Sequence, residues 1–516
     1  MRVLFVQKYL PAEMVGIMYL SSALKKAGHE VRTQFVPEKH WREKAREYAP
    51  QVLAYSVTTG DHVSYLELNR ELKELTGAYS VFGNAHPTFV PHMIEEEGVD
   101  AICRGEGEYA FSELCTRLER GENVRDVRNF WIKQDGRVHR NPVRPLVANL
   151  EELGFPDRSV IYDSGECYRA MERKIFITQR GCPNSCSYCF HHAWRDKVYE
   201  ATRKQYVRKR SVGHVIAEIQ QVRERYPLRF VHFLDDIFNI NDRWLEEFCQ
   251  RWPKEVGLPF DVILRTNLTT QKQMRELKRV GCISARLAFE AANDQIRNVV
   301  YRKSVTLSDI KTSSRHVKEA GIRLTSLQLL GAPGGTLQDE LDTLQLNIDC
   351  KVDHPWVSLL QPYAMTDINE YTKHLGIAVD EWDRFPEKFN RTTALHHPHR
   401  REVENLHKLF PLVVRFPFLM PAVPFLVRRH FLKPVYLGLY ALWTEYLVSE
   451  QNRDWAVATG RGGWRSLPLV DWISRTTVKV ALRAQAALFG QRFRKAALAL
   501  KMRSDTLVHV DEALEG

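Results

Sequence analysis

Short apolar runs alternate with amphipathic stretches along residues 1–365, and this alternation restricts the fold more than any other feature of the chain. Strand-like runs near the start lie at residues 3–6, 31–35, 52–57, 81–82 and 101–102, and helix-like stretches lie at 15–27 and 65–75. Strands and helices in alternation predict an α/β fold with a doubly wound (Rossmann-like) parallel sheet. Ligands of such sheets bind beyond the carboxyl ends of the strands.

The same alternation resumes after residue 170 and runs over a longer course. Six further strand-like runs occupy residues 175–178, 231–234, 262–264, 285–289, 324–330 and 357–360. Amphipathic stretches such as 215–225 and 244–251 separate them. Six strand–helix units predict a partial (β/α)6 barrel of the TIM type, whose reactive groups lie on the loops at the carboxyl ends of the strands.

A length of 516 residues predicts about three domains, at roughly 150 residues each. We divide the chain into an α/β domain (1–125), a connector (126–170), the barrel (171–365) and a mainly helical, basic, partly apolar region (366–516). The connector contains Asp135 and Gly136 between apolar runs, and this pair is a hairpin signal.

The nine cysteines are an odd number spread thinly over a long chain, which does not indicate a disulfide framework. No secretory signal pattern opens the sequence, which begins with a strand-like run. We therefore expect a reducing, cytoplasmic compartment, where closely spaced cysteines indicate metal binding or catalysis.

Three of the cysteines, Cys182, Cys186 and Cys189, follow the first barrel strand on a loop that also contains Gly, Pro, Asn and Ser. Soft thiolates at this C-x3-C-x2-C spacing can hold zinc or an iron–sulfur cluster. His191 and His192 follow closely, so a structural zinc site stays open. Three ligands on a four-iron cluster would leave one iron free for a substrate or cofactor.

Three loops at predicted strand ends in the first domain have small or polar residues that permit close approach of a ligand. Each loop taken alone is typical of ordinary turns and helix caps. Three of them at successive strand ends favour a ligand site. The residues concerned are Ser56, Thr58, Gly83, His86, Gly105, Glu106 and Gly107.

The spacing Cys-x3-Cys-x-aromatic-Cys at the start of a partial barrel resembles the radical S-adenosylmethionine (SAM) superfamily. The resemblance implies that the cysteines hold a 4Fe-4S cluster, whose free iron binds SAM for reductive cleavage to a 5'-deoxyadenosyl radical. It also implies SAM contacts from the cysteine motif and from the barrel strand ends. The matching residues are Tyr188, Asp235 or Asp236, Arg265 and Glu290. Gly335 replaces the Glu that is usual in the segment after the fifth strand, so a carboxylate there is not expected to act directly.

Residues 1–125 resemble the cobalamin (B12)-binding domain that precedes this barrel in one large subgroup. The subgroup is related to anaerobic magnesium-protoporphyrin IX monomethyl ester cyclase and to class B radical SAM methyltransferases. The resemblance implies that the three loops contact cobalamin, with His86 as a candidate at the corrin edge. Many such domains supply an axial His after the first strand, but residues 7–11 contain none, so we expect no protein imidazole on the lower face.

Together, the two resemblances imply a cobalamin-dependent radical SAM enzyme, with methyl transfer to an unactivated carbon of a small-molecule or lipid-like substrate as the favoured reaction. The implied cofactors do the difficult chemistry, so no side chain is assigned as an acid or base. An electron donor such as flavodoxin or ferredoxin is an expected partner. The alternatives are a radical SAM oxidative cyclase or rearranging enzyme and, from a different class, a zinc-stabilised membrane or nucleic-acid binding protein.

The basic character of the chain is concentrated near its carboxyl end. Of a net charge of +11, residues 401–516 contribute 17 Lys and Arg against 10 Asp and Glu. Apolar residues dominate 410–448, but four prolines between Pro411 and Pro424 argue against a membrane-spanning helix. Residues 472–503 contain eight basic side chains and no acidic one, which fits either an anionic membrane surface or a helix packed on the enzyme.

We therefore expect peripheral membrane association through 410–503, at the inner face of the membrane, as one possibility for this region. Nucleic acid is not an expected partner, because no aromatic-and-basic recognition module accompanies the charge. The histidine-rich stretch 396–399 is compatible with metal binding, but a solvated loop or the start of a helix is favoured.

Overall fold

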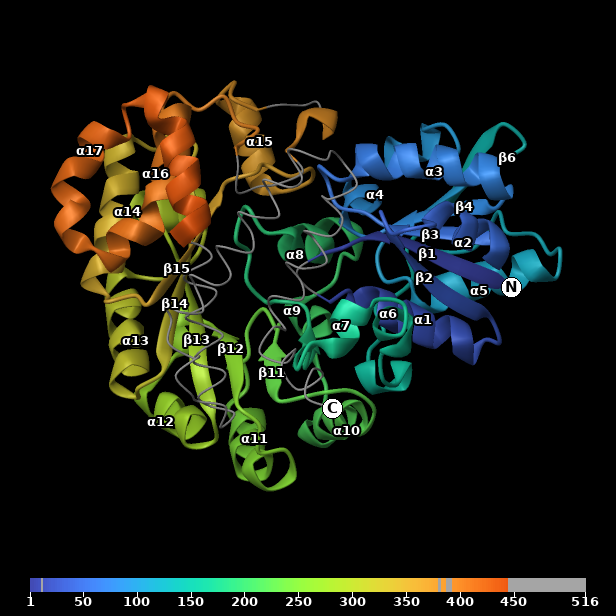
Figure 1. Ribbon diagram of the computed structural model, residues 1–516, viewed down its shortest axis with the longest axis horizontal. Coiled ribbons are helices and arrows are strands. Elements are labelled where there is room, and N and C mark those ends of the chain that lie inside the picture. Colours follow the sequence, from blue (N-terminus) through green and yellow to red (C-terminus); the bar gives the residue numbers. More distant parts are fainter. Residues whose placement is uncertain (11–12, 379–381, 387–391, 444–516) are drawn as a thin grey trace, which may run out of the picture.

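A computed structural model describes residues 1–10, 13–378, 382–386 and 392–443 of the chain. Figure 1 shows an amino-terminal α/β unit beside a curved half-barrel, with further helices next to the last strands of the half-barrel. This arrangement confirms the predicted fold class. The basic stretch 472–503 lies outside the described residues.

The amino-terminal sheet has the strand order β2-β1-β3-β4-β5-β6-β7. Its parallel strands are β1 (Arg2–Lys8), β2 (Glu30–Val36), β3 (Val52–Ser56), β4 (Tyr79–Gly83) and β5 (Ala101–Cys103). The helices that connect or follow them are α1 (Val15–Lys26), α2 (Trp41–Tyr48), α3 (His62–Thr76), α4 (Ala85–Phe89) and α5 (Glu108–Glu119). The strand order reverses between β1 and β3, and such a reversal marks the ligand-binding edge of a doubly wound sheet.

Helices cover both faces of this sheet because alternate residues of a strand point to opposite faces. On β1, Val3 and Phe5 belong to one buried cluster with residues of α1 and α5. Leu4 and Val6 belong to a second buried cluster with residues of α2 and α3. A strand that is buried on both faces needs apolar residues at successive positions, which explains the uninterrupted run at residues 3–6.

The predicted hairpin is present, but it belongs to the sheet and not to a connector between domains. β6 (Phe130–Gln134) pairs antiparallel with β5, and β7 (Arg137–Arg140) pairs antiparallel with β6. Asp135 and Gly136 form the two-residue turn, with φ angles of 52° and 69°. Asp-Gly suits a turn with two positive φ angles. The hairpin covers β5, which would otherwise present an open edge of backbone hydrogen-bonding groups.

The half-barrel has the strand order β15-β14-β13-β12-β11-β8, with parallel neighbours throughout. Its strands are β8 (Arg173–Phe176), β11 (Phe230–Phe233), β12 (Phe260–Leu264), β13 (Cys282–Glu290), β14 (Arg323–Leu330) and β15 (His354–Leu359). The helices between them are α10 (Val212–Arg225), α11 (Asp242–Glu255), α12 (Gln271–Arg279), α13 (Leu307–Glu319) and α14 (Leu337–Asp349). All six strands overlap the apolar runs identified in the sequence, with bounds that differ by up to three residues.

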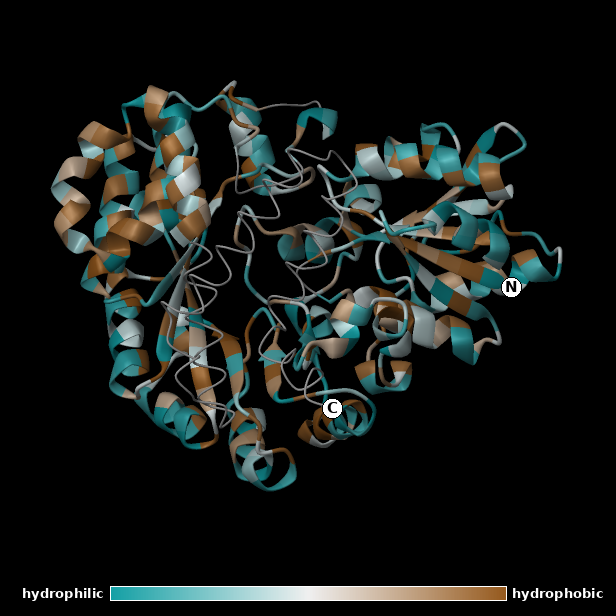
Figure 2. Ribbon diagram, in the orientation of Figure 1, coloured by the Kyte–Doolittle hydropathy of each residue, from teal (hydrophilic) through white to brown (hydrophobic). Residues whose placement is uncertain are grey.

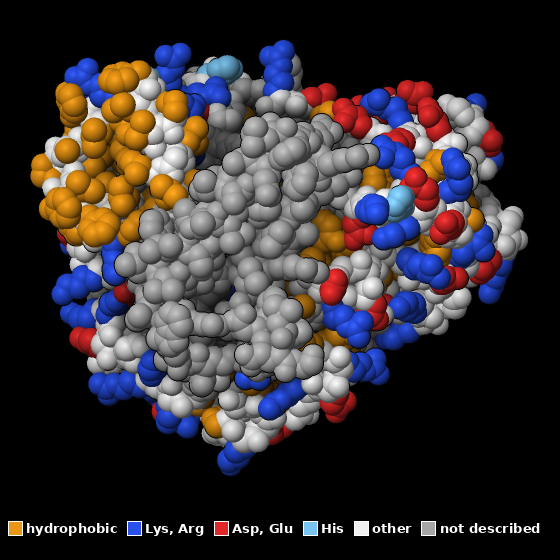
Figure 3. Space-filling view, viewed as in Figure 1, with side chains coloured by type: hydrophobic (Ala, Val, Ile, Leu, Met, Phe, Trp, Pro, Cys, Tyr) orange, Lys and Arg blue, Asp and Glu red, His pale blue; other side chains and the backbone are white. Residues whose placement is uncertain are grey.

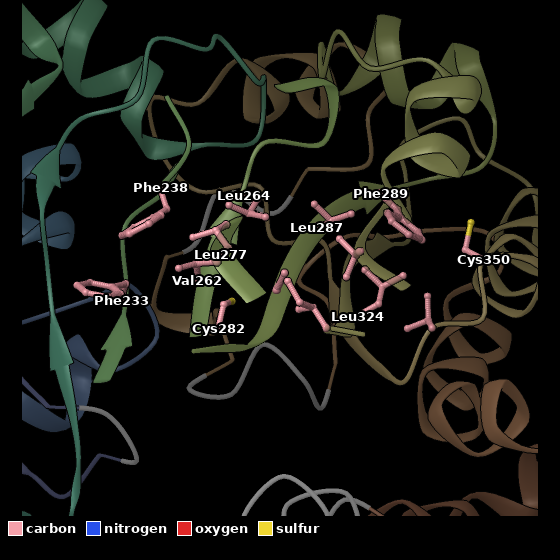
Figure 4. Close-up of a cluster of buried hydrophobic side chains, with 14 of the residues drawn as sticks. Phe233, Phe238, Val262, Leu264, Leu277, Cys282, Leu287, Phe289, Leu324 and Cys350 are labelled. Atoms are coloured by element: carbon pink, nitrogen blue, oxygen red, sulfur yellow. The ribbon is translucent and has the colours of Figure 1, made fainter. Parts of the chain in front are cut away.

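One buried cluster joins these strands to the helices that surround them. Figure 4 shows Phe233, Val262, Leu287 and Leu324, which come from four neighbouring strands and lie in this cluster. Helices α12, α13 and α14 each begin with a capping box. The side chain of the N-cap Thr accepts from a backbone N–H in the first turn, and the side chain of a Gln or Asp three residues later accepts from the backbone N–H of the Thr. Caps of this kind set where each helix starts, and so where each preceding strand-end loop stops.

Short elements separate β8 from α10, and they carry the cysteine loop. They are β9 (Gln179–Arg180), α8 (Phe190–Ala193), α9 (Arg203–Tyr206) and β10 (Arg208–Lys209). β9 and β10 pair antiparallel, so the segment that contains the cysteines leaves the barrel and returns to it as a closed excursion. Between the two domains lie α6 (Ser159–Tyr162) and α7 (Glu166–Ala170).

The helices after β15 include α15 (Asp367–His374), α16 (Arg400–Arg415) and α17 (Val423–Leu426). α16 packs against α14 and β15. α16 continues through Pro411 and ends at Arg415, and a 3-10 helix, Pro417–Ala422, follows it, so the predicted interruption is present from Pro417 onward and not at Pro411. Within the described ranges, no helix combines the length and the apolar character that a membrane crossing would need.

A buried ionic cluster ties the amino-terminal domain to the half-barrel. Arg158 donates to Glu13 at 3.1 Å and to Glu218 on α10 at 2.7 Å. Arg210 donates to the other carboxylate oxygen of Glu218 at 2.6 Å. These side chains are at most 5% exposed, so each charge depends on its partners for compensation.

We expect Arg158→Ala to destabilise the protein by about 3–5 kcal/mol, because it leaves the buried Glu13 without its counter-charge and Glu218 with Arg210 as its remaining ion-pair partner. The matched control is Arg251→Ala, which removes an ion pair with Glu255 at the surface of α11. Thermal unfolding followed by circular dichroism measures both. A melting temperature of Arg158→Ala equal to that of the control would contradict the assigned role of the cluster.

Candidate active site

The cysteine loop is held in place by backbone contacts from several elements. Ser187 donates from its backbone N to Tyr301 O at 3.0 Å and from its hydroxyl to Val300 O at 2.5 Å. Arg195 donates to Pro183 O at 3.0 Å. Gly181 has a φ of 88°, and a Cβ there would lie 2.2 Å from Tyr206 O, so only glycine fits. The loop is therefore positioned by the fold before any ligand binds.

Cys182 and Cys189 have perturbed acidities. Burial raises the pKa of the Cys182 thiol. Burial also raises the pKa of Cys189, and the nearby Cys186 and Cys182 sulfurs raise it further. Three thiolates this close repel one another and need positive charge among them, which an iron–sulfur cluster supplies. The donor set therefore fits a cluster with three thiolate ligands.

The two histidines that could complete a zinc site are engaged elsewhere. His191 contacts Asp236 at 2.7 Å through Nε2 and the Tyr206 hydroxyl at 2.9 Å through Nδ1. His192 lies between Asp196 and Asp367, at 3.3 Å and 3.2 Å. Zinc binding by either histidine would require these contacts to be broken.

Tyr188 and Glu290, both predicted near SAM, meet in one network beside the cysteine loop. The Tyr188 hydroxyl donates to Glu290 Oε1 at 2.6 Å. Lys303 Nζ donates to the same oxygen at 2.7 Å and to the Tyr188 oxygen at 3.2 Å. Burial opposes the charge on Lys303, but Glu290 outweighs it and raises the lysine pKa. Lys303 was missed by sequence analysis, since nothing in its neighbourhood of the sequence signals burial.

Glu290 owes its orientation to an irregularity in β13. Its φ is 63°, which is rare for a residue with a side chain, and the pairing between β13 and β14 shifts register between Ala288 and Glu290. A β-bulge of this kind redirects the side chain that it contains. Arg265 lies close by, where its side chain donates to Asn267 Oδ1 at 3.0 Å and to the backbone oxygen of Lys303.

The two neighbouring carboxylates after β11 have different environments. Asp235 is buried and accepts from the Thr178 backbone N at 2.7 Å, its hydroxyl at 2.6 Å and the Gln179 backbone N at 3.0 Å. Asp236 is 42% exposed and contacts His191. Asp235 therefore holds the start of the cysteine excursion, and Asp236 is the carboxylate of the two that has surface left for a ligand. Its contact with SAM remains a prediction.

The glycine-rich segment after β14 receives a carboxylate from a position that sequence analysis did not identify. Glu340 on α14 accepts from Gly331 N at 2.7 Å and from Ala332 N at 3.4 Å. Burial raises the pKa of Glu340 to about 7. Gly335 provides no carboxylate at the position of the usual Glu. The carboxylate of Glu340 instead binds the backbone of this segment at Gly331 and Ala332.

The predicted cobalamin-facing residues divide into two groups. Ser56 and Gly83 lie at the ends of β3 and β4, where the Ser56 hydroxyl accepts from Asn84 at 3.1 Å. His86 is buried, and its ring stacks on that of His62 at 3.9 Å. Burial, and to a smaller extent the neighbouring His62, lower the pKa of His86 to about 3. The imidazole is therefore neutral at physiological pH.

Thr58 is exposed and donates to Asp61 at 3.3 Å. The neutral imidazole of His86 and small hydroxyl side chains at a sheet edge suit the uncharged amide side chains of a corrin, so this group fits cobalamin. In the loop that carries an axial His in many such domains, Tyr9 stacks on Phe35 at a centroid distance of 4.6 Å. The second imidazole of the stacked pair, His62, was not among the sequence predictions.

The second group, around Gly105, Glu106 and Gly107, faces the barrel. Glu106 binds Arg180 at 3.1 Å and Arg208 at 2.8 Å. Although burial opposes ionisation, Arg208 and Arg180 lower the pKa of Glu106. Gly105 has a φ of 84°, and a Cβ there would clash with the Tyr199 hydroxyl at 2.3 Å. Glu106 is thus committed to an interdomain ion pair, and a direct contact with cobalamin is not its visible role.

Two family models match the chain in separate segments. Residues 1–115 match the B12 binding domain, and residues 176–346 match the radical SAM superfamily. The chain therefore joins a B12-binding domain to a radical SAM domain and is a cobalamin-dependent radical SAM enzyme. These domains imply a 4Fe-4S cluster, SAM and cobalamin as cofactors.

Relatives of this chain share only about a quarter of its residues in the aligned regions. The anaerobic magnesium-protoporphyrin IX monomethyl ester cyclase of Rubrivivax gelatinosus is 26% identical, over 77% of this chain and 74% of its own. An uncharacterized methyltransferase of Pyrococcus horikoshii is 23% identical, over 69% of this chain and 78% of its own. Among solved structures, the radical SAM methyltransferase TsrM of Kitasatospora setae, with cobalamin and a 4Fe-4S cluster bound, is similar to this chain with a TM-score of 0.61 at 17% identity. The similarity covers 73% of this chain and 76% of TsrM, and it shows a shared fold.

We expect Cys182→Ala, Cys186→Ala and Cys189→Ala each to lose most of the bound iron and sulfide after anaerobic purification, since each removes one of three cluster ligands. Cys167→Ala is the matched control, because Cys167 is a half-buried cysteine outside the loop. Iron and sulfide analysis and visible absorption measure the loss. Stoichiometric zinc without iron in the unsubstituted protein would contradict the cluster assignment.

Glu340 predicts a pH dependence of stability with a defined sign. Its pKa rises from 4.5 to about 7 on folding, so the folded chain binds this proton more tightly than the unfolded chain. This contribution to stability is complete below pH 4.5 and is lost as the pH rises through about 7.

Glu340→Gln keeps an oxygen that can accept from Gly331 and cannot ionise. We expect its melting temperature, relative to the unsubstituted protein, to increase between pH 5 and pH 8 by the amount that this single proton contributes. Thermal melts across that range measure the difference between the two proteins. A constant difference would show that Glu340 does not titrate there.

Proposed function

We propose that this enzyme transfers a methyl group to an unactivated carbon of a small-molecule or lipid-like substrate. The observation that carries the proposal is the apposition of the two domains: the loop that follows β5 binds, through Glu106, to Arg180 and Arg208 on either side of the cysteine excursion. A cobalamin at the edge of the first sheet and a cluster on the cysteine loop would then serve one substrate space. Methyltransferases among the relatives and similar folds support the same reaction.

When bound, the cofactors supply a radical for hydrogen abstraction and a methyl group for transfer. The chain's own residues bind and orient them. Cys182, Cys186 and Cys189 are the proposed cluster ligands. Tyr188 is proposed to border the adenine of SAM, with its hydroxyl position set by Glu290 and Lys303.

Charge matching supports the remaining proposed contacts with SAM. Asp236 offers a carboxylate to the amino group of SAM, and Arg265 offers a guanidinium to its carboxylate. Both side chains are anchored by protein partners, His191 for Asp236 and Asn267 for Arg265. Anchored side chains position a ligand with less loss of entropy than mobile ones. A flavodoxin or ferredoxin is the proposed electron donor.

A radical SAM cyclase or rearranging enzyme is the second candidate function. It is favoured by one specific observation, the 26% identity to a magnesium-protoporphyrin ester cyclase over 77% of this chain. The two candidates would share the domains and the cofactors, and they differ in whether methyl leaves SAM.

The deciding experiment uses protein purified anaerobically, loaded with cluster and corrinoid, and supplied with SAM, a reductant and an extract of candidate substrates. Methyl transfer predicts S-adenosylhomocysteine and 5'-deoxyadenosine together, with isotope from methyl-labelled SAM in a product. 5'-Deoxyadenosine without S-adenosylhomocysteine would favour the cyclase or rearranging enzyme.

Tyr188→Phe is expected to raise the Kd for SAM severalfold while the iron content stays unchanged, because it releases the Glu290 contact and leaves the cysteines intact.

A further inference from the structure

An exposed apolar face lies on the helices that follow the half-barrel. Figure 3 shows hydrophobic side chains gathered over the α16–α17 region with basic side chains at the edge, and Figure 2 shows α17 largely in hydrophobic colours. Phe418 is 77% exposed, Phe431 76% and Phe425 58%. We call this surface the apolar face. Its exposed side chains are Phe416, Phe418, Phe425, Phe431, Val435, Leu437, Leu439 and Leu442.

The face is built by interrupted helices, so it cannot be the side of one long amphipathic helix. The 3-10 helix Pro417–Ala422, α17 and the 3-10 helix His430–Leu432 follow one another in short turns. Val423 and Val427 point inward and are fully buried, which anchors these turns to the core of the half-barrel. The large aromatic residues left outside are therefore held outward by the packing of their neighbours.

Positive charge predominates around the face, where the described carboxylates Glu402 and Glu404 lie against His430 and Lys433. Residues 405–444 contain no Asp or Glu. Arg428 and Arg429 are exposed, and Arg429 lies over the Phe425 ring at 4.2 Å. Lys433 is paired with Glu404 at 3.0 Å, so the uncompensated charge of this surface comes chiefly from the two arginines. A contiguous apolar surface with a polar rim marks an interaction site.

Charge decides among the occupants that could cover the apolar face. A second copy of the chain in a two-fold contact would bring two basic rims together. The chain's own residues 444–516 hold eleven Lys and Arg against eight Asp and Glu, and their stretch 472–503 has no acidic residue, so they would add net charge of the same sign. Both arrangements bury Arg428 and Arg429 against like charge, whereas an anionic lipid surface offers the opposite charge together with an apolar interior.

We infer that the apolar face docks the enzyme on an anionic phospholipid bilayer, with the phenylalanines inserted at the boundary of headgroups and acyl chains and the two arginines at the phosphates. The docking is interfacial, in keeping with the interrupted helices. It stands independently of the reaction, because it uses none of the residues of the candidate active site.

The test is flotation of the full chain with vesicles of equimolar phosphatidylcholine and phosphatidylglycerol, compared with phosphatidylcholine alone. We expect the chain to float with the anionic vesicles, and more weakly at high salt. Phe418→Ser with Phe431→Ser, and separately Arg428→Glu with Arg429→Glu, are expected to reduce the partition coefficient at least about tenfold each. Both pairs are exposed, so folding is retained, and circular dichroism checks this.

Two control variants match these changes on other surfaces. Tyr109→Ser removes an exposed aromatic residue of α5, and Arg203→Glu with Arg225→Glu reverses two exposed charges outside the apolar face. We expect both to bind vesicles as the unsubstituted chain does. Equal binding by the apolar-face variants and the controls would overturn the inference, and so would an absence of flotation.

A photocrosslinker identifies the occupant directly. With Phe418 replaced by benzoylphenylalanine in the full chain, we expect crosslinks to phospholipid in the presence of anionic vesicles. Crosslinks to a second copy, or to residues 444–516 of the same chain with no lipid adduct, would overturn the inference in favour of a dimer or of self-coverage.

Discussion

The arrangement of this enzyme depends on ion pairs that are buried where its two sheets meet. A doubly wound sheet and a half-barrel each expose loops at the carboxyl ends of their strands, and each alone would place its ligand at an open edge. Glu106, bound to Arg180 and Arg208, brings the loop after β5 against the excursion that carries the cysteines. A different docking geometry would leave these partly buried charges without their partners, so the ion pairs favour one geometry over others.

Buried charges that are paired within the protein can be distinguished from side chains that are left to contact a ligand. Asp235 is buried and satisfied by three hydrogen bonds, whereas its neighbour Asp236 keeps part of its surface. Both carboxylate oxygens of Glu106 accept hydrogen bonds from arginines. The cysteine sulfurs differ from these carboxylates, because soft thiolates at this spacing are ligands for a metal cluster. Carboxylates that are paired within the protein support the fold, and the thiol donor set indicates where a cofactor would bind.

Much of this could be predicted from the sequence, because it rests on local patterns. The apolar runs gave every barrel strand, and the Asp135-Gly136 turn gave the hairpin. What could not be predicted depends on contacts between distant segments. Lys303 reaches Glu290 from another loop, Glu340 reaches Gly331 from α14, and Glu106 turns toward the barrel when its sequence suggests only a turn. Burial and ion pairing of this kind have no signature in spacing or composition.

The network at the barrel mouth has a further consequence for how a cationic cofactor is received. Glu290 already carries the Lys303 ammonium at 2.7 Å, so the pair is close to neutral and a sulfonium ion does not meet a bare buried carboxylate. We propose that Asp236, which lies at the surface of the loop, is the carboxylate that an incoming amino group would meet. Selectivity for the orientation of SAM would then arise from the position of one accessible carboxylate, while Tyr188, tied to Glu290 and Lys303, supplies a wall of fixed shape.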